Sequence, residues 1–375
     1  MKIYDDIKRN FVHLHCHSEF SCRDGLSKLS DLTTHASDNK LPYLCLTDHG
    51  NIAGWLRFYK ACNENKIKPI FGCEVYVNNY RHLDRETLDD NTKSLYKKYY
   101  HLVVIAQNQK GVSNLIKINN DAHVNGFYYK PRTDFDMLQK NSEGLIILSA
   151  CIGGEIPYHL LQNNEKEAYE TAKRYKDAFR DKYFIELQVH NMQEQIDTNK
   201  KLIELANELQ LKTVVTNDCH YIAKEDNLVH DVLIAIRDRS SKSGNEITDI
   251  QGYHARELYY KNYDEMHASW DRYHNNDIFT EETFINSVNT VSEILDTIKK
   301  VEFRGDIKLP KLYDNEEEVF KQKIEEGIVR RYKTSNISDE LRDRINYEFT
   351  VIRKMKYIGY FLIIEDIMSY ARNNN

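Results

Sequence analysis

Histidine and aspartate side chains near the start of the chain have the types and the spacing of a metal site. The stretch FVHLHCHSEFSCRD, residues 11–24, places His15 and His17 two residues apart in an apolar run and ends at Asp24. In a β-strand, side chains two apart point to the same face. His15 and His17 could therefore hold one ion from that face, with Asp24 reaching back from the following loop. His13 lies one pair deeper, and we interpret it as a core histidine or a support for a ligand.

Residues of the same chemical types recur at the ends of later apolar runs. His49 stands in TDHG, Glu74 in GCE and Cys151 in SAC. Asp218 and His220, in NDCH, repeat the alternate spacing of the first pair. Imidazole, carboxylate and thiolate groups are the usual ligands of transition metals. Each residue alone has a simpler explanation, such as a helix cap or a buried core side chain. Together, several buried ionisable groups at one end of a sheet would require cations between them.

Strand-like and helix-like segments alternate over residues 11–220. The predicted strands are Phe11–His15, Tyr43–Thr47, Ile70–Val77, Leu102–Ala106, Leu145–Ser149, Phe184–Val189 and Thr213–Thr216. The predicted helices are Leu26–Asn39, Ile52–Asn65, Gly111–Ala122, Pro157–Phe179 and Met192–Leu209. This alternation predicts the α/β class, with a mostly parallel sheet or a seven-stranded barrel enclosed by helices. Active sites in such folds gather where the strands end. His101 precedes its apolar run, so it joins the other candidates only if its strand is reversed or short.

Composition limits the class of protein. The chain has 375 residues, of which 41% are hydrophobic, so it can form a large core or two domains. The net charge of −6 gives no overall basic field, although positive charge can be confined to one cleft or supplied by metal ions. The seven scattered cysteines, without a signal peptide, indicate reduced thiols in a cytoplasmic protein. The apolar runs are too short to span a membrane.

The candidate residues belong to a linked series of motifs that resembles a known family. The series consists of HLHCHSEFS (13–21), DG (24–25), LTDHG (46–50), GCEVYV (72–77), YHLVVIAQNQKG (100–111), GFYYKPR (126–132), SEGLIILSACIGGEIP (142–157) and TNDCHY (216–221). It resembles the polymerase-and-histidinol-phosphatase (PHP) domain at the front of the alpha subunits of bacterial DNA polymerase III. Residues 339–371 are similar to the opening of the polymerase palm in the same family.

The resemblance implies a division of the chain into three parts. These are a PHP metal-dependent phosphoesterase domain over residues 1–285, a connecting helix and linker over 286–337, and the beginning of the palm over 338–375. The helical segment Glu281–Lys299 is expected to lead away from the barrel. Ser338 is expected to cap the first helix of the palm-like part.

The resemblance also implies a fold and a set of site residues. The fold is a distorted seven-stranded (β/α)7 barrel, followed by a mainly helical segment. Its site holds three divalent ions, of zinc, manganese or iron, on nine ligands: His15, His17, Asp24, His49, Glu74, His101, Cys151, Asp218 and His220. His15, His17, Asp218 and His220 are expected to act in catalysis. Asp48 and His13 could orient ligand imidazoles. The segment Tyr128–Arg132 combines aromatic rings with two cations and could contact a DNA strand.

The implied function is that of a replicative DNA polymerase whose PHP domain is a 3′–5′ proofreading exonuclease. The aspartates that hold Mg²⁺ for polymerisation would lie beyond Asn375, so this chain alone is not expected to extend a primer. Expected partners are the 3′ end of a DNA primer, the rest of the polymerase chain, a replisome clamp and a proofreading subunit, with no membrane. Two alternatives stay open. One is a metal-stabilised structural module that docks a separate proofreading subunit, and the other is a stand-alone PHP phosphatase.

Overall fold

The computed structural model describes residues 11–374, except residues 23, 84, 240–255, 304, 306 and 307. The chain forms two compact units, Met1–Glu302 and Phe303–Asn375. The first unit contains the sheet and all nine candidate ligands, whereas the second is helical. The predicted α/β fold with a helical segment after it is therefore confirmed.

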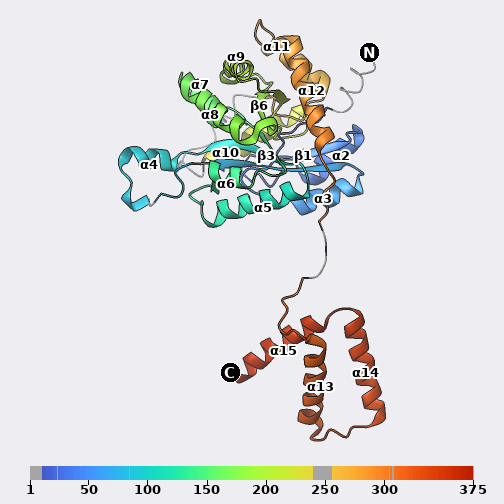
Figure 1. The fold of residues 1–375 in the computed structure, drawn as a ribbon. Coiled ribbons are helices and arrows are strands. Elements are labelled where there is room, and N and C mark those ends of the chain that lie inside the picture. Colours follow the sequence, from blue (N-terminus) through green and yellow to red (C-terminus); the bar gives the residue numbers. More distant parts are fainter. Residues whose placement is uncertain are drawn as a thin grey trace. The chain divides into compact units, whose positions relative to one another are not determined.

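A curled mixed sheet forms the first unit (Figure 1). Its strands are β1 Tyr43–Leu46, β2 Lys68–Val77, β3 Tyr100–Ala106, β4 Arg132–Thr133, β5 Leu145–Leu148, β6 Tyr183–Gln188 and β7 Thr213–Thr216. The order is β1-β2-β3-β5-β6-β7, and β4 pairs with β2. The β1–β2, β2–β4, β5–β6 and β6–β7 pairs are parallel, but β3 runs antiparallel to both β2 and β5. The sheet is therefore less parallel than the alternation of elements predicts.

The segment predicted as the first strand links the two edges of this sheet. No regular strand is assigned over Phe11–His15. The backbone of Cys16 nevertheless forms an isolated parallel β-bridge with that of Cys219, just after β7. The N–H of His17 donates to the carbonyl of Cys219 at 2.8 Å. On the other side, the N–H of Thr47, just after β1, donates to the carbonyl of Cys16 at 2.8 Å. The first motif thus closes the curled sheet into a barrel-like shape at the end where the parallel strands finish.

Helices lie on both sides of the sheet (Figure 1). In the first unit they are α2 Leu29–Asp38, α3 Trp55–Glu64, α4 Asp90–Lys97, α5 Gln109–Val124, α6 Phe135–Lys140, α7 Glu155–Leu161, α8 Glu165–Phe179, α9 Gln193–Glu208, α10 Asn227–Arg239, α11 Tyr263–Tyr273 and α12 Glu281–Thr297, with short 3-10 turns at Arg85–Thr87, Arg180–Lys182 and Lys224–Asp226. The single helix predicted from Pro157 to Phe179 is two helices. Asn163 has a φ of 54°, which ends α7, and the side chain of Asn164 caps α8 by accepting from the N–H of Glu167.

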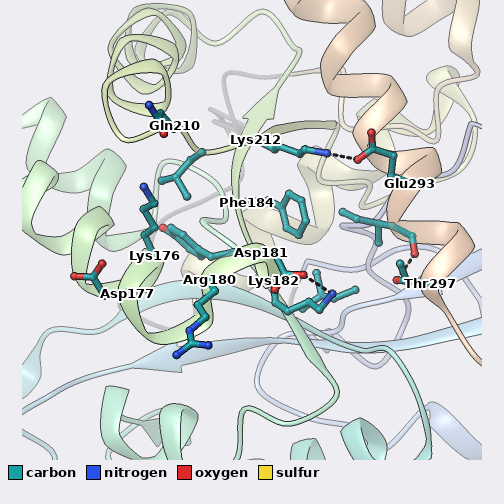
Figure 2. Close-up of a pocket in the computed structure, with 14 residues that line it drawn as sticks. Lys176, Asp177, Arg180, Asp181, Lys182, Phe184, Gln210, Lys212, Glu293 and Thr297 are labelled. Carbon is teal, nitrogen blue, oxygen red and sulfur yellow. Dashed lines mark hydrogen bonds and ion pairs between the residues drawn. The ribbon is translucent and has the colours of Figure 1, made fainter.

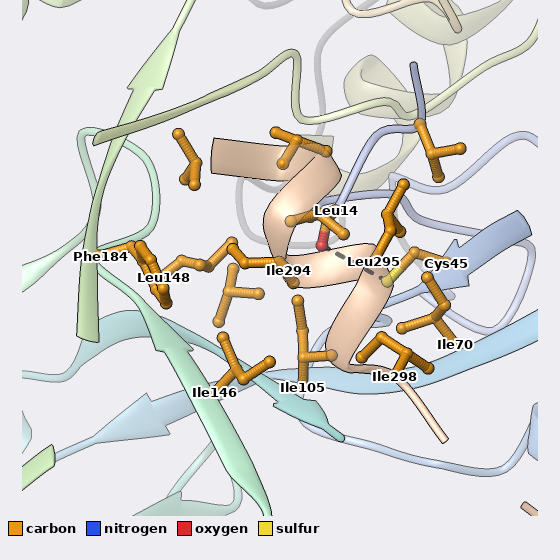
Figure 3. Close-up of a cluster of buried hydrophobic side chains, with 14 of the residues drawn as sticks. Leu14, Cys45, Ile70, Ile105, Ile146, Leu148, Phe184, Ile294, Leu295 and Ile298 are labelled. Carbon is orange, nitrogen blue, oxygen red and sulfur yellow. Dashed lines mark hydrogen bonds between the residues drawn. The ribbon is translucent and has the colours of Figure 1, made fainter. Parts of the chain in front are cut away.

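Helix α12 is part of the barrel core, so the expectation that it leads away from the barrel is wrong. Leu295 of α12 and Ile298, just after this helix, pack in one cluster with Leu14, Cys45 and other buried side chains (Figure 3). The carbonyl of Ile298 also accepts a hydrogen bond of 2.7 Å from Lys68, the first residue of β2. The apolar face of α12 therefore fills the end of the barrel where the parallel strands begin, opposite the end that carries the candidate ligands.

The second unit consists of α13 Glu316–Tyr332, α14 Asp339–Lys354 and α15 Ile358–Asn373. As predicted, Ser338 caps α14, because its Oγ accepts a hydrogen bond from the N–H of Leu341 at 3.4 Å. Phe320 packs against Phe349 and Phe361, with ring centroids 6.0 Å apart in both pairs. Among the described residues of both units, no helix is long and apolar enough to cross a membrane.

Replacing Leu295 with alanine tests whether α12 belongs to the core. Leu295 is 3% exposed, so Leu295→Ala should lower the free energy of unfolding of the first unit by about 2–5 kcal/mol. Tryptophan fluorescence during urea unfolding reports this unit selectively, because both tryptophans, Trp55 and Trp270, lie in it. Leu56→Ala, at an exposed position of α3, is the matched control and should change little. Equal stability of the two variants would show that α12 does not support the barrel.

Candidate metal centre

The pairing of Cys16 with Cys219 brings the first and last motifs together. With Cys16 facing the other way, His15 and His17 point to one side, and both are fully buried. Their Nε2 atoms lie 3.2 Å and 3.0 Å from Oδ1 of Asp218. The same Nε2 atoms are both 3.4 Å from Oε2 of Glu74. Four residues from three distant parts of the sequence therefore face a common point.

Glu74 lies at the middle of the cluster, with no exposure to solvent. Its Oε2 is 2.6 Å from Nδ1 of His49, and its Oε1 is 2.7 Å from Nδ1 of His101. Cys151 is close to both, with Sγ 3.8 Å from Oε1 of Glu74 and 3.6 Å from Nδ1 of His101. His101 reaches the site because β3 is reversed: it pairs with Tyr76, two residues after Glu74. The sequence resemblance thus places His101 with the other candidates, and strand direction explains how.

Asp24 and His220 complete the group. Oδ2 of Asp24 is 3.5 Å from Nε2 of His49, on the side of that imidazole away from Glu74. The ring of His220 stacks on that of His17, with centroids 4.5 Å apart. All nine candidates therefore meet at one end of the barrel. Three overlapping groups each bring three potential ligand atoms within 4.8 Å of one another: His15, His17 and Asp218; His17, His49 and His220; His49, Glu74 and His101.

The buried polar atoms at this point fit divalent cations. Nε2 of His15, Nε2 of His17 and Oδ1 of Asp218 are buried and have no hydrogen-bond partner among the described residues. Nδ1 of His49 and Oε2 of Glu74 are likewise buried without a hydrogen bond in the described part of the chain, and their closest contact is the ion pair between them at 2.6 Å. Buried polar atoms in folded proteins are nearly always satisfied, so five orphaned atoms that face one another need an explanation. Imidazole nitrogens and carboxylate oxygens at these separations can share cations, which would satisfy all five.

The charged groups of the cluster shift one another's pKa values. Burial opposes the charged form of each group, but the surrounding charges outweigh burial at several positions. Asp218, Glu186 and Glu74 raise the pKa of His15 well above its usual value, and Glu74 raises the pKa of His49 to about 9. In return, the imidazoles hold the pKa of Glu74 well below its usual value. The carboxylates therefore stay ionised and draw positive charge into the site, as protons or as metal ions.

Hydrogen bonds outside the cluster fix the orientation of its imidazoles. Nδ1 of His15 is 2.7 Å from Oε1 of Glu186, which also accepts from the hydroxyl of Thr216 at 2.6 Å. Nδ1 of His17 is 3.0 Å from Oγ of Ser21, which in turn donates to Asp48 at 2.8 Å. Both hydrogen bonds favour a proton on Nδ1, so that with a metal bound the lone pair of Nε2 would face the site.

The sequence predicts that Asp48 and His13 could orient ligand imidazoles. Asp48 orients a candidate ligand, as the sequence suggests, but it does so through Ser21. His13 does not: its Nε2 donates to the carbonyl of Lys261 at 2.7 Å, away from the cluster. The sequence analysis missed Glu186. Its signal is a lone acidic residue in the apolar strand segment YFIELQ, where a carboxylate needs a buried partner.

The cluster opens into a cavity of about 320 Å³. Its walls include Tyr76, Tyr99, Lys130, His190 and Arg237 beside six of the candidate ligands. Arg237 lies 3.4 Å from Oδ2 of Asp24. A larger cavity of about 690 Å³ lies near the start of β6, where Lys212 pairs with Glu293 (Figure 2). None of the nine candidates lines that larger cavity, so the smaller one is the candidate site.

Comparison with known sequences agrees with this geometry. Residues 13–190 match the PHP domain, and residues 318–375 match the bacterial DNA polymerase III alpha NTPase domain. The first unit thus contains a segment that matches the PHP domain. It also matches curated DNA polymerase III alpha subunits from Treponema pallidum, at 35% identity, and Aquifex aeolicus, at 34% identity, in each case over 98% of this chain. The chain is thus similar to DNA polymerase III alpha subunits along nearly its whole length.

The matches cover nearly all of this chain but only about a third of each relative. The chain spans 30% of the length of the Treponema protein and 32% of that of the Aquifex protein. A relative from Thermus aquaticus is 31% identical over 98% of this chain and 34% of its own length. Among solved structures, a putative metal-dependent phosphoesterase from Bifidobacterium adolescentis matches 56% of this chain and 88% of its own, at 14% identity and a TM-score of 0.35.

Added divalent cations should stabilise the first unit. Starting from chelator-treated protein, saturating Mn²⁺ or Zn²⁺ should raise its melting temperature by roughly 5–10 °C, because ligands that bind only the folded state stabilise it. Differential scanning fluorimetry measures the shift. His17→Ala should remove most of it, whereas His159→Ala, which changes a half-buried histidine outside the cluster, should keep it. The same shift in both variants would place the metal elsewhere.

Glu186→Gln tests whether the buried carboxylate orients His15. A glutamine amide can donate to Nδ1 and move the imidazole proton to Nε2, so metal affinity should fall about 10–100-fold. Competition with a fluorescent chelator measures that affinity. Glu155→Gln is the matched control, because Glu155 is also largely shielded and pairs with Arg174 at 3.1 Å, outside the cluster. If Glu186→Gln binds metal as tightly as the unaltered protein, Glu186 does not orient His15 and serves only in packing.

Proposed function

We propose that this chain is a metal-dependent phosphoesterase that removes nucleotides from the 3′ end of DNA. The observation that carries the proposal is the meeting of His15, His17, Glu74 and Asp218 at unpartnered buried atoms beneath an open cavity. We propose as metal ligands the nine residues of the cluster: His15, His17, Asp24, His49, Glu74, His101, Cys151, Asp218 and His220. Similarity to DNA polymerase III alpha subunits supports DNA as the substrate, because proofreading acts on the primer end that a polymerase has just extended.

The proposed site holds three divalent ions of zinc, manganese or iron. When bound, such ions polarise a phosphoryl oxygen and make water a nucleophile near neutral pH. Six positive charges would meet four negative charges from Asp24, Glu74, Asp218 and a Cys151 thiolate, leaving roughly +2. Glu186 removes one further charge, while Arg237 at the cavity returns one. The site therefore stays positive and attracts a phosphodiester within an acidic protein.

The residues of the chain have distinct roles in this proposal. His15, His17, Asp218 and His220, from the first and last motifs, act directly in hydrolysis. Glu186 and the Ser21–Asp48 pair hold the rings of His15 and His17 so that Nε2 of each faces the position proposed for the metal ions. Arg237, beside Asp24, adds a cation at the edge of the centre that can bind a phosphate oxygen.

We further propose that the chain serves DNA replication in the cytoplasm as part of a DNA polymerase III alpha subunit. Residues 338–375 would begin the palm, with the segment before it joining the palm to the metal-binding part. The partners in this proposal are the primer 3′ end, the remaining polymerase sequence, a replisome clamp and a proofreading subunit.

The double substitution of His15 and His17 by alanine tests the nuclease. The variant should lose bound metal and release labelled nucleotide from an oligonucleotide 3′ end at least 100-fold more slowly, since losing ligands exceeds the roughly 10–100-fold effect of losing a support. The double variant His82→Ala/His159→Ala removes two histidines outside the cluster and should retain full activity.

Two results would contradict the proposal. Full DNA hydrolysis by the metal-free His15/His17 variant would place the nuclease outside this cluster. Stoichiometric metal in the unaltered protein without hydrolysis of DNA or of a chromogenic phosphomonoester would support the structural-module alternative. Hydrolysis of the monoester alone would support the phosphatase alternative.

A further inference from the structure

We propose that the turn Gly126–Arg132 binds a nucleic-acid strand next to the metal centre and selects a polynucleotide over a small phosphate ester. The turn places Tyr129 in solvent and Lys130 in the wall of the cavity. This inference rests on the proposed function for the identity of the strand. Its geometry is independent of that function, and its test separates the two.

Arg132 anchors the turn and does not reach solvent. Its side chain is 1% exposed, and its Nε donates to the carbonyl of Gly126 at 3.0 Å, which closes the turn. Its guanidinium lies over two rings, 4.5 Å from the centroid of Tyr96 and 5.1 Å from that of Tyr128. Of the two cations that the sequence offers for DNA, Arg132 is therefore structural, and Lys130 is the one that lines the cavity.

The anchored turn holds Tyr129 in a costly position. Tyr129 has a φ of 57°, a region that bulky residues rarely occupy, and its side chain is 82% exposed. The N–H of Tyr128 donates to the carbonyl of Lys130 at 3.0 Å, across this residue. Phe127, in the same turn, is 60% exposed. Two aromatic rings in water, one of them on a strained backbone, are suited to stacking on unpaired bases.

Lys130 connects the turn to the centre. Its Nζ lies 3.2 Å from Oη of Tyr76 and 4.9 Å from the centroid of the Tyr76 ring. That ring stacks on His49, with centroids 6.2 Å apart and planes 17° apart, and meets His101 edge-on at 5.3 Å. The ammonium group is thus separated from two candidate ligands by one aromatic ring.

The turn also packs on the loop that carries His49. Gly50 follows that histidine with a φ of 61°, and a Cβ there would come within 3.0 Å of Cγ of Pro131. The close packing fixes the distance between the turn and the centre. Lys130 contacts the Tyr76 ring in the cavity wall, and we assign it to the phosphate of the adjoining nucleotide. A small ester has no such second phosphate, which is why the turn would discriminate between the substrates.

Two substrates distinguish this role from a general effect on the centre. The first is a single-stranded oligonucleotide with a 3′ fluorophore, and the second is bis(p-nitrophenyl) phosphate, a small diester. Lys130→Gln and Tyr129→Ala should each raise KM for the oligonucleotide about tenfold. Both should leave kcat/KM for the small diester and the melting temperature unchanged. The matched controls are Lys93→Gln and Tyr347→Ala, at exposed positions outside the turn, and these should alter neither substrate.

Binding of an uncleavable phosphorothioate oligonucleotide, measured by fluorescence anisotropy, separates this proposal from the proposed nuclease. Tenfold weaker binding in the two turn variants supports the turn even if the unaltered protein hydrolyses no DNA. Equal loss of activity on both substrates would show that Lys130 only supports the centre. Oligonucleotide binding and KM equal to those of the unaltered protein would overturn the proposal.

Discussion

The structure depends on the burial of ionised carboxylates among imidazoles at one end of the barrel. Glu74 has no contact with solvent, yet its two oxygens lie 2.6 Å from a nitrogen of His49 and 2.7 Å from one of His101. Such a carboxylate is costly to bury unless positive charge surrounds it. Protons on His15 and His49 can supply part of that charge, and divalent cations can supply more while satisfying the orphaned atoms.

The fold brings these carboxylates and imidazoles to one end of the barrel by combining parallel and antiparallel strands. Parallel strands β1 and β7 deliver His49, Asp218 and His220 just beyond their ends, as in other α/β folds. Reversal of β3 adds His101 from the beginning of a strand. The N-terminal segment then places its two histidines between the edges of the sheet, where the backbone of Cys16 pairs with that of Cys219. At the other end, α12 fills the barrel with apolar side chains, so polar chemistry is confined to one end.

The sequence predicts much of this arrangement, and its failures have physical causes. Six of its seven strands are found, because short apolar runs with β-branched residues, such as Leu145–Leu148, favour buried strands. Strand direction is set by long-range pairing, so periodicity alone left His101 unplaced. The apolar spacing of α12 indicates a helix but not its partner. Arg132 reads as a surface cation, and only coordinates show its guanidinium buried between Tyr96 and Tyr128. Glu186 is visible in the sequence only as an acid in an apolar strand.

Metal stoichiometry tests the central claim most directly. Inductively coupled plasma mass spectrometry on the purified chain, compared with Glu74→Gln, counts the ions that the buried carboxylate helps to retain. The account predicts about three transition-metal ions per unaltered chain, and a clear loss in Glu74→Gln although the variant remains folded by circular dichroism. An unaltered chain that binds no metal at saturating Zn²⁺ or Mn²⁺, or a Glu74→Gln variant that retains the full complement, would contradict it.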